Sequence, residues 1–227
     1  MEETRNVFTC SYGEEDRISR LPDNLIHHIM SFNDMKYAVW TSLLSKRWIH
    51  VWKSLPILNF CRSSFSPRKT KRFIEFVYFV CIFRYDTNMQ KFNVQWWDPE
   101  SGIENKMIMN VNRWILFAVK RDVQEISIKI EFLRKSVYEI PHLLINCKSL
   151  RALDIIIMHE AGVDIILPTS MNLPQLRVLY LRGLSYSDVE LSAKLLSSFP
   201  VLESLHIFHC DIQMDNHGNL IVASATL

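Results

Sequence analysis

The sequence predicts an α+β protein in which a short helical region precedes an array of repeats with one β-strand each. Apolar residues recur at helical spacing in three successive pieces between Asp16 and Phe60. The pattern L-x-x-L-x-L then recurs four times, with starts 27, 26 and 26 residues apart. At 227 residues and 48% hydrophobic composition, the chain is long enough to bury a core. We therefore expect a disordered N-terminus at 1–15, a helical region at 16–60, a linker at 61–72 and the repeat array at 73–227.

Each predicted helix has its own start signal. Pro22 suits the opening turn of the first helix, where its missing N–H costs nothing. Asp34 is an N-cap for the second and Ser45 for the third, which Pro56 ends. Three helices in about 40 residues cannot bury their apolar residues among themselves. The helical region therefore needs a partner surface.

The linker and two longer helices follow. The segment CRSSFSPRKTKR at 61–72 is polar and basic, and we favour a solvated connector over a nuclear signal there. The apolar run from Phe73 to Phe83 predicts a buried helix. The segment from Ile103 to Ala118 predicts an amphipathic helix on the outer side of the array.

The period of the repeated pattern is typical of leucine-rich repeats, whose units run about 20 to 29 residues with one strand each. The four units are Val123-Ile126-Ile128, Leu150-Leu153-Ile155, Leu176-Leu179-Leu181 and Leu202-Leu205-Ile207, and Met89-Phe92-Val94 fits an earlier, degenerate unit. Because side chains alternate along a strand, the residues between the apolar positions face away from the core. We place on this concave face Glu125, Ser127, Lys129, Asp154, Tyr180, Arg182, Ser204, His206 and Phe208.

The mixed charges of this face favour a protein ligand over an anionic polymer, and an unused, solvated sheet face is the alternative. The chain ends 25 residues after Leu202, where the first leucine of another repeat is due. We therefore expect an array that is incomplete at its C-terminus, with Ile207, Leu220 and Ile221 exposed.

The helical region carries a specific resemblance. The segments L-P-D-x-L-I-x-x-I and A-V-x-x-S-x-L-S-K-R-W, with a tryptophan four residues later, resemble the F-box. The fuller motif D-R-I-S-x-L-P-D-x-L resembles the plant F-box/leucine-rich-repeat proteins, over about 45 residues. The resemblance implies that this region docks onto the adaptor of an SCF-type (cullin-RING) ubiquitin ligase and that the repeats select a target protein. It assigns to the adaptor interface Leu21, Pro22, Leu25, Ile26, Ile29, Leu44, Ser45, Lys46, Trp48 and Trp52.

The chain departs from the family pattern on the second helix. Asn33-Asp34 stands where a leucine-proline pair is usual, and Tyr37 and Trp40 stand where an acidic and a small residue are commoner. Asp34 can still cap the helix, so we expect the fold to survive and the adaptor affinity to change. A self-contained three-helix core is the alternative for these apolar positions.

Composition excludes several other functions. The formal charge of +2 gives no field that favours nucleic acid, and no apolar run approaches the length of a membrane span. The five scattered glycines form no phosphate-binding loop, and the five cysteines include no C-x-x-C pair. The irregular group His206, His209, Cys210 and His217 does not indicate zinc.

We therefore expect an intracellular substrate receptor, cytoplasmic or nuclear, with no cofactor, no metal, no nucleic-acid partner and no enzymatic activity. The alternatives are a non-ligase repeat scaffold and a truncated product with a degenerate F-box.

Overall fold

The computed structural model describes residues 21–43, 46–66, 69–97, 103–132, 137–158, 163–166, 172–186 and 199–212. Three α-helices and one 3-10 turn come first: α1 (Asp23–Ser31), α2 (Met35–Trp40), η2 (Thr41–Leu43) and α3 (Lys46–Ser54). The next elements are β1 (Ile57–Cys61), η3 (Arg62–Ser64), α4 (Thr70–Phe83), β2 (Lys91–Trp96) and α5 (Glu104–Val119). The remaining strands are β3 (Glu125–Glu131), β4 (Val137–Glu139), β5 (Ala152–Met158), β6 (Val163–Ile166), β7 (Val178–Arg182), β8 (Leu184–Tyr186), β9 (Ser204–Phe208) and β10 (Asp211–Ile212).

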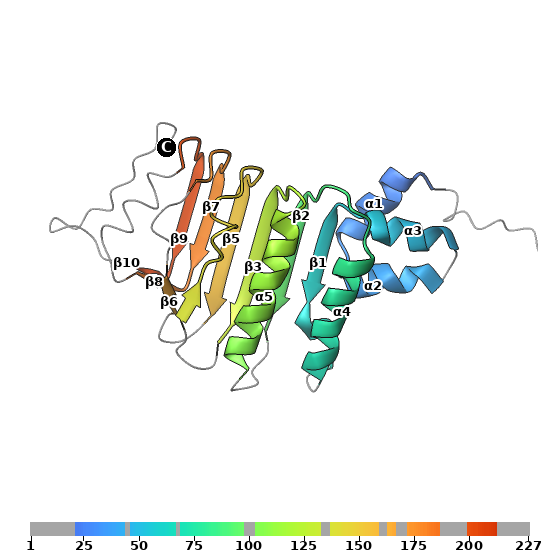
Figure 1. Ribbon diagram of the computed structural model, residues 1–227, viewed down its shortest axis with the longest axis horizontal. Helices are drawn as coiled ribbons and strands as arrows, with labels where there is room; N and C mark the ends of the chain where they lie inside the picture. The colour runs from blue at the N-terminus through green and yellow to red at the C-terminus, as the bar shows by residue number, and fades with distance from the viewer. Residues whose placement is uncertain are drawn as a thin grey trace, which may run out of the picture.

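The described strands form two parallel sheets. The main sheet has the order β1-β2-β3-β5-β7-β9, and a smaller one has the order β10-β8-β6-β4. Helices α4 and α5 lie on one face of the main sheet, and α1, α2 and α3 gather beside β1 (Figure 1). The prediction of a helical N-terminal region followed by an array of strands is confirmed at this level.

A repeated backbone contact sets the register of the main sheet. In the main sheet, the carbonyl of a residue just before one strand accepts hydrogen bonds from two successive N–H groups at the start of the neighbouring strand. The acceptors are the carbonyls of Pro56, Gln90, Gln124, Arg151 and Arg177. The first acceptor stands before β1, which is the first strand of the main sheet, although these residues were expected to belong to the helical region.

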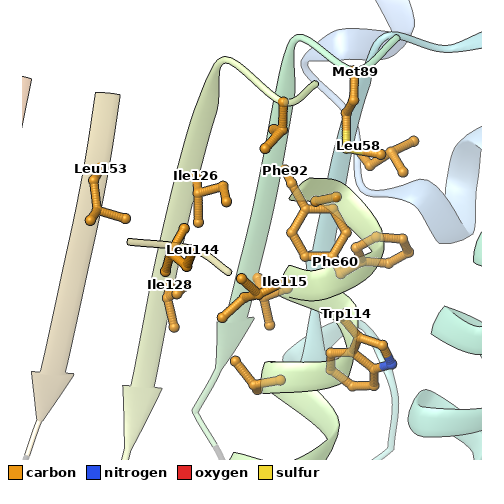
Figure 2. Packing of buried hydrophobic residues seen from close by; sticks show 14 of the residues in the cluster. Leu58, Phe60, Met89, Phe92, Trp114, Ile115, Ile126, Ile128, Leu144 and Leu153 are labelled. Atoms are coloured by element: carbon orange, nitrogen blue, oxygen red, sulfur yellow. The ribbon is translucent and has the colours of Figure 1, made fainter. Parts of the chain in front are cut away.

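The core lies between the main sheet and the helices. Leu58, Phe92, Ile126 and Leu153 are neighbours in register and lie in one row (Figure 2). Trp114 of α5 packs toward this side of the sheet. These side chains are buried, as the alternating pattern of the strands requires.

Helices α4 and α5 overlap the two segments for which the sequence predicts longer helices, and regular structure also enters the segment expected as linker. Strand β1 ends at Cys61, η3 follows, and α4 starts at Thr70, so regular structure occupies most of the segment expected as linker. Helix α4 buries Phe73 and Val77 but leaves Ile82 and Phe83 exposed, because only one side of it faces the sheet. Residues 1–15, which were expected to be disordered, lie outside the described residues. So do Leu220 and Ile221, which were expected to be exposed.

Candidate protein-binding surfaces

Two helices near the N-terminus expose large apolar side chains. On α1, Leu25, Ile29 and the adjoining Phe32 are exposed, and their spacing of four and three residues places them on one side of the helix. Along α2 and η2, the exposed side chains are Tyr37, Trp40 and Leu43. We call these six residues the helical apolar surface. Phe32 and Leu43 were not among the predicted interface residues, although Phe32 lies seven residues after Leu25, a spacing that places both on one side of a helix.

Polar contacts fix the helices that carry this surface. The Arg47 guanidinium donates to the Leu21 carbonyl and pairs with Asp23. The His27 ring lies 3.0 Å from the Ser54 hydroxyl. These contacts join the start of α1 to the start of α3, and the middle of α1 to the end of α3.

Asp34 ties α2 to the sheet. One carboxylate oxygen accepts from the Lys36 N–H at 2.7 Å, which confirms the predicted cap, and the other accepts from the Cys61 N–H at 2.6 Å. Burial raises the pKa of Asp34, although these hydrogen bonds oppose the shift. The backbone of Asp34 has φ −64°, the value that proline imposes. Asp34 thus has a φ value that proline would also accept, and its side chain adds a hydrogen bond to β1.

The structure divides the residues assigned to the adaptor interface. Pro22, Leu25 and Ile29 are exposed, and Leu21 is half-buried. The side chains of Ile26, Trp48 and Trp52 are instead buried in the core of the chain, where they are shielded from any partner in this conformation. Helix α4 covers part of this core, because Phe79 stacks on Trp52 at 5.8 Å. Leu44, Ser45 and the side chain of Lys46 lie outside the described residues.

The second candidate surface is the face of the main sheet opposite α4 and α5, which we call the open face. Three registered rows cross it. They are Ile57, Lys91, Glu125, Ala152, Val178 and Ser204, then Asn59, Asn93, Ser127, Asp154, Tyr180 and His206, then Cys61, Gln95, Lys129, Ile156, Arg182 and Phe208. All nine residues predicted for the concave face stand in these rows. The contribution of β1 was missed because β1 was not recognised as a strand, and that of β2 was missed although Met89-Phe92-Val94 was recognised as a degenerate unit.

Charges in the middle of the open face neutralise one another. Lys91 pairs with Glu125 at 3.0 Å, and Lys129 lies 3.8 Å from Asp154. The Ser127 hydroxyl donates to Asp154 at 2.8 Å. Ser127 was expected to be exposed but is buried, because its short side chain lies below its longer neighbours.

Aromatic side chains gather on β7 and β9. The Tyr180 ring stacks on Phe208 with centroids 5.4 Å apart, and the His206 ring lies 5.7 Å from Tyr180. His206 and Phe208 are exposed, and Tyr180 is half-buried. We call these three residues the aromatic cluster.

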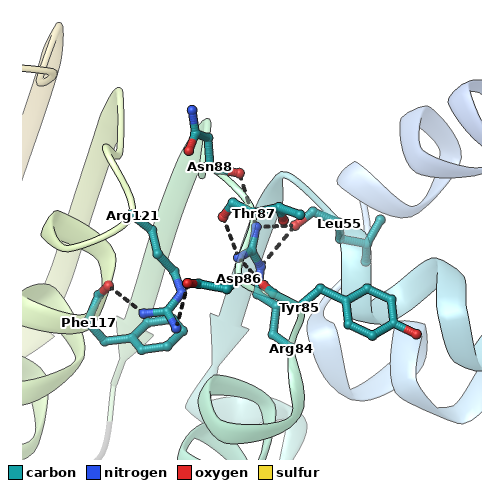
Figure 3. Close-up of polar contacts among 8 residues, drawn as sticks. All are labelled: Leu55, Arg84, Tyr85, Asp86, Thr87, Asn88, Phe117 and Arg121. Atoms are coloured by element: carbon teal, nitrogen blue, oxygen red, sulfur yellow. Dashed lines mark hydrogen bonds and ion pairs between the residues drawn. The ribbon is translucent and has the colours of Figure 1, made fainter.

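A buried arginine joins the helical region to the loop that leads into the main sheet. Arg84, 5% exposed, follows α4 and donates to the carbonyls of Leu55, Tyr85, Thr87 and Asn88 at 2.8–3.3 Å (Figure 3). Leu55 follows α3, so the guanidinium connects the helical region to the loop that enters β2. Burial lowers the pKa of Arg84 to about 10, which leaves it protonated at neutral pH.

Arg121 adds a second contact to the same loop. Its guanidinium lies 3.3 Å from a carboxylate oxygen of Asp86 and 3.8 Å from the centre of the Phe117 ring (Figure 3). The loop between α4 and β2 is thus held from the helical region on one side and from the end of α5 on the other.

Within the described ranges, no three His, Cys, Asp or Glu side chains come together as a metal site would require. His217 of the irregular histidine group lies outside these ranges. No described helix is long and apolar enough to cross a membrane.

The described part of the chain thus combines a helical region that exposes apolar side chains with a parallel sheet that has an open face. The family model "F-box domain" matches residues 18–60. The family model "FBD-associated F-box protein At5g56370, LRR repeats" matches residues 111–227, more than half of the chain. The chain belongs to the plant family of F-box proteins with leucine-rich repeats.

Similar proteins in Arabidopsis thaliana are named as F-box proteins, and some of these names also include LRR repeats. The chain is 30% identical to a putative F-box/LRR-repeat protein, At4g15060, over 94% of its own length and 49% of the relative's. It is 32% identical to the FBD-associated F-box protein At4g10400, over 93% of its own length and 49% of the relative's. It is 31% identical to the F-box protein At4g09920, over 93% of its own length and 64% of the relative's. The chain spans about half the length of the first two relatives, and no solved structure matches it.

Proposed function

We propose that the chain is the substrate-recognition subunit of an SCF-type ubiquitin ligase. The observation that carries the proposal is an F-box match over residues whose helices expose six large apolar side chains. Apolar and aromatic anchors of this kind supply most of the binding energy of protein interfaces. The occupant of this surface is the small adaptor of the ligase.

The proposed adaptor interface centres on Leu25, Ile29 and Trp40. Pro22 and Leu21 extend it at the start of α1, and Leu44, Ser45 and Lys46 remain assigned to it by the family resemblance alone. Ile26, Trp48 and Trp52 support the interface from within the core. Their role is to hold the helices that present the exposed side chains.

The open face of the sheet is the proposed site for the target protein. The contacts of Arg84 and Asp34 support a fixed geometry between the two surfaces, because both residues bond to the helical region and to the sheet side. A target held there comes close to the ubiquitin carrier of the ligase, which raises its effective concentration. This chain performs no chemistry in the mechanism, and it acts inside the cell, in the cytoplasm, the nucleus or both.

The sequence predicts residues 16–60 as a three-helix F-box and 73–227 as a curved repeat solenoid, and in this proposal the solenoid begins earlier, with β1. The repeated carbonyl contact that begins at Pro56 supports a first repeat strand inside the F-box match. The segment at 61–72 is then the first turn of the array as well as a connector.

A matched pair of variants tests the adaptor interface. Leu25 and Leu143 have nearly equal exposure, 47% and 48%, but Leu143 lies in the repeat region. Leu25→Asp places a charge in the proposed apolar interface and should weaken capture of the purified adaptor by about 100-fold or more. Leu143→Asp should bind like the unaltered chain. Equal capture by both variants, with equal melting temperatures, would refute the proposal.

The alternative is a repeat scaffold whose F-box no longer binds the adaptor, and the Asn33-Asp34 departure favours it. Asn33→Leu with Asp34→Pro restores the family pair at a backbone angle that proline accepts. Binding by this double variant, with none by the unaltered chain, would establish the scaffold. Adaptor capture by the unaltered chain at comparable strength would exclude it.

A further inference from the structure

The two halves of the open face differ in chemistry. On β1 and β2 the second row presents the amides of Asn59 and Asn93, 3.4 Å apart. On β7 and β9 it presents Tyr180 and His206, with Phe208 in the next row. The half built by β7 and β9 is therefore the one that offers apolar area to a ligand.

The charges of the open face are also unequally available. Lys91, Glu125, Lys129 and Asp154 are engaged with one another. In the described part of the chain, Arg182 has no carboxylate within ion-pair distance, and it stands in register beside Phe208. Among the described residues, the β7–β9 half thus combines three aromatic rings with an arginine that has no carboxylate partner.

The spacing of these groups suits an extended peptide. Tyr180 and Arg182 are two residues apart on one strand, which is about 6.6 Å at the rise of a β-strand. Side chains i and i+2 of an extended peptide project in the same direction at the same separation. An aromatic side chain over the aromatic cluster would therefore place the side chain two residues later beside the Arg182 guanidinium.

We propose that β7 and β9 bind a target segment in which an aromatic residue is followed, two positions later, by an anionic side chain. Arginine forms its strongest contacts with carboxylate and phosphoryl oxygens, so either group meets the requirement. Ring-to-ring contact supplies the second part of the recognition. This inference rests on the proposed function, because it specifies the chemistry of the target that the repeats would select.

The test uses the full chain labelled with 15N and the acetylated peptide Gly-Ser-Phe-Gly-Glu-Gly-Ser-amide. Three further peptides replace Glu by Gln, Glu by phosphoserine, or Phe by Ala. Peptide titrations are followed by amide chemical shifts in the unaltered chain, in Arg182→Gln and in Tyr180→Ala. Arg151→Gln is the control, because Arg151 is an exposed arginine outside the three rows of the open face.

We expect shifts confined to β7, β9 and their loops. The Gln peptide and the Arg182→Gln variant should each bind about fivefold more weakly, and the Ala peptide and Tyr180→Ala about tenfold more weakly. Tighter binding of the phosphoserine peptide would assign a phosphorylated target, and weaker binding a carboxylate. Equal affinity for the Glu and Gln peptides, shifts elsewhere, or no shift at millimolar peptide would overturn the inference.

Adaptor capture by the same variants separates this inference from the proposed function. Arg182→Gln and Tyr180→Ala should capture the adaptor as the unaltered chain does. Failed peptide binding with intact capture removes only the peptide specificity. Failed capture by the unaltered chain removes the ligase role.

Discussion

Replacing Arg84 by methionine tests whether one buried side chain fixes the helical region to the sheet. Methionine keeps much of the aliphatic volume but removes every hydrogen bond to the carbonyls of Leu55, Tyr85, Thr87 and Asn88. A buried acceptor left without a donor costs about 1–3 kcal/mol. The side chains of Tyr85, Thr87 and Asn88 are exposed, so their carbonyls can turn toward water, whereas Leu55 is buried.

The expected loss of unfolding free energy is therefore about 3 kcal/mol, the cost of the Leu55 carbonyl plus part of the cost of the others. For a chain of this size the melting temperature should fall by roughly 6–12 °C. Urea unfolding and differential scanning calorimetry measure both quantities. The loss of the connection should also let the helical region unfold before the sheet, which would appear as two transitions.

Arg177→Met is the matched control, because Arg177 bonds to Glu203 with both side chains more than half exposed. A surface ion pair of this kind contributes about 0–1 kcal/mol. If Arg84→Met were no more destabilising than Arg177→Met, or if it left a single transition at the original temperature, the assigned role of Arg84 would be wrong.

Four other measurements test separate parts of the structure. Gly183→Ala should destabilise the chain by about 2 kcal/mol or more in urea unfolding, because Gly183 has φ +76° and an added Cβ would lie 1.8 Å from the Ile157 carbonyl oxygen; a neutral result would contradict this turn. Asp34→Ala should cost about 1–2 kcal/mol through the lost cap and the lost bond to Cys61, and hydrogen exchange should quicken at the Lys36 and Cys61 amides; unchanged exchange at both would be inconsistent with the two bonds. Cys81, whose pKa burial raises to about 12, should resist alkylation at pH 8 in the folded chain and react in urea, since the thiolate is the nucleophile; rapid reaction in the folded chain would show that the thiol is accessible. Trp48→Ala should lower stability by about 3–5 kcal/mol, as expected for a buried aromatic residue, and lose adaptor capture only through unfolding; a folded variant that fails to bind would restore Trp48 to the interface.

The pH dependence of stability has a defined sign at Cys81. The folded-state pKa lies above the ordinary value of 9.0, so the folded chain holds this proton more tightly than the unfolded chain does. The unfolding free energy therefore decreases as the pH rises from about 9 toward 12, because the unfolded chain loses this proton first. Below about pH 9 the thiol is protonated in both states, so its titration does not make the unfolding free energy depend on pH.

Much of the architecture was predictable from local pattern. The strands at Ile126, Leu153, Leu179 and Leu205 follow from apolar residues that alternate at a constant interval, because each strand buries one face against its neighbours. The Asp34 cap follows from a single residue type before a helix, since that bond is made within three residues. Such features need no information about distant parts of the chain.

The helical apolar surface could not be predicted from local sequence pattern alone. Leu25 and Ile26 are equally apolar neighbours, yet one is exposed and the other is buried. Which side of α1 faces inward depends on α3, whose contacts come from residues more than twenty positions away. The burial of Trp52 likewise depends on Phe79 of α4.

The sequence by itself determined the class of the protein: a motif of the F-box type, a repeat period and the inward positions of the strands in the four recognised repeats. Only the tertiary structure decided which apolar residues are available to a partner and which charges are already satisfied. Lys91 and Glu125, 34 positions apart, meet because parallel pairing brings equivalent positions of successive units side by side. Arg182 has no such counterpart among the described residues, because its registered neighbours are Ile156 and Phe208. Availability for binding is therefore a property of the register, which forms only when units distant in sequence pair in the sheet.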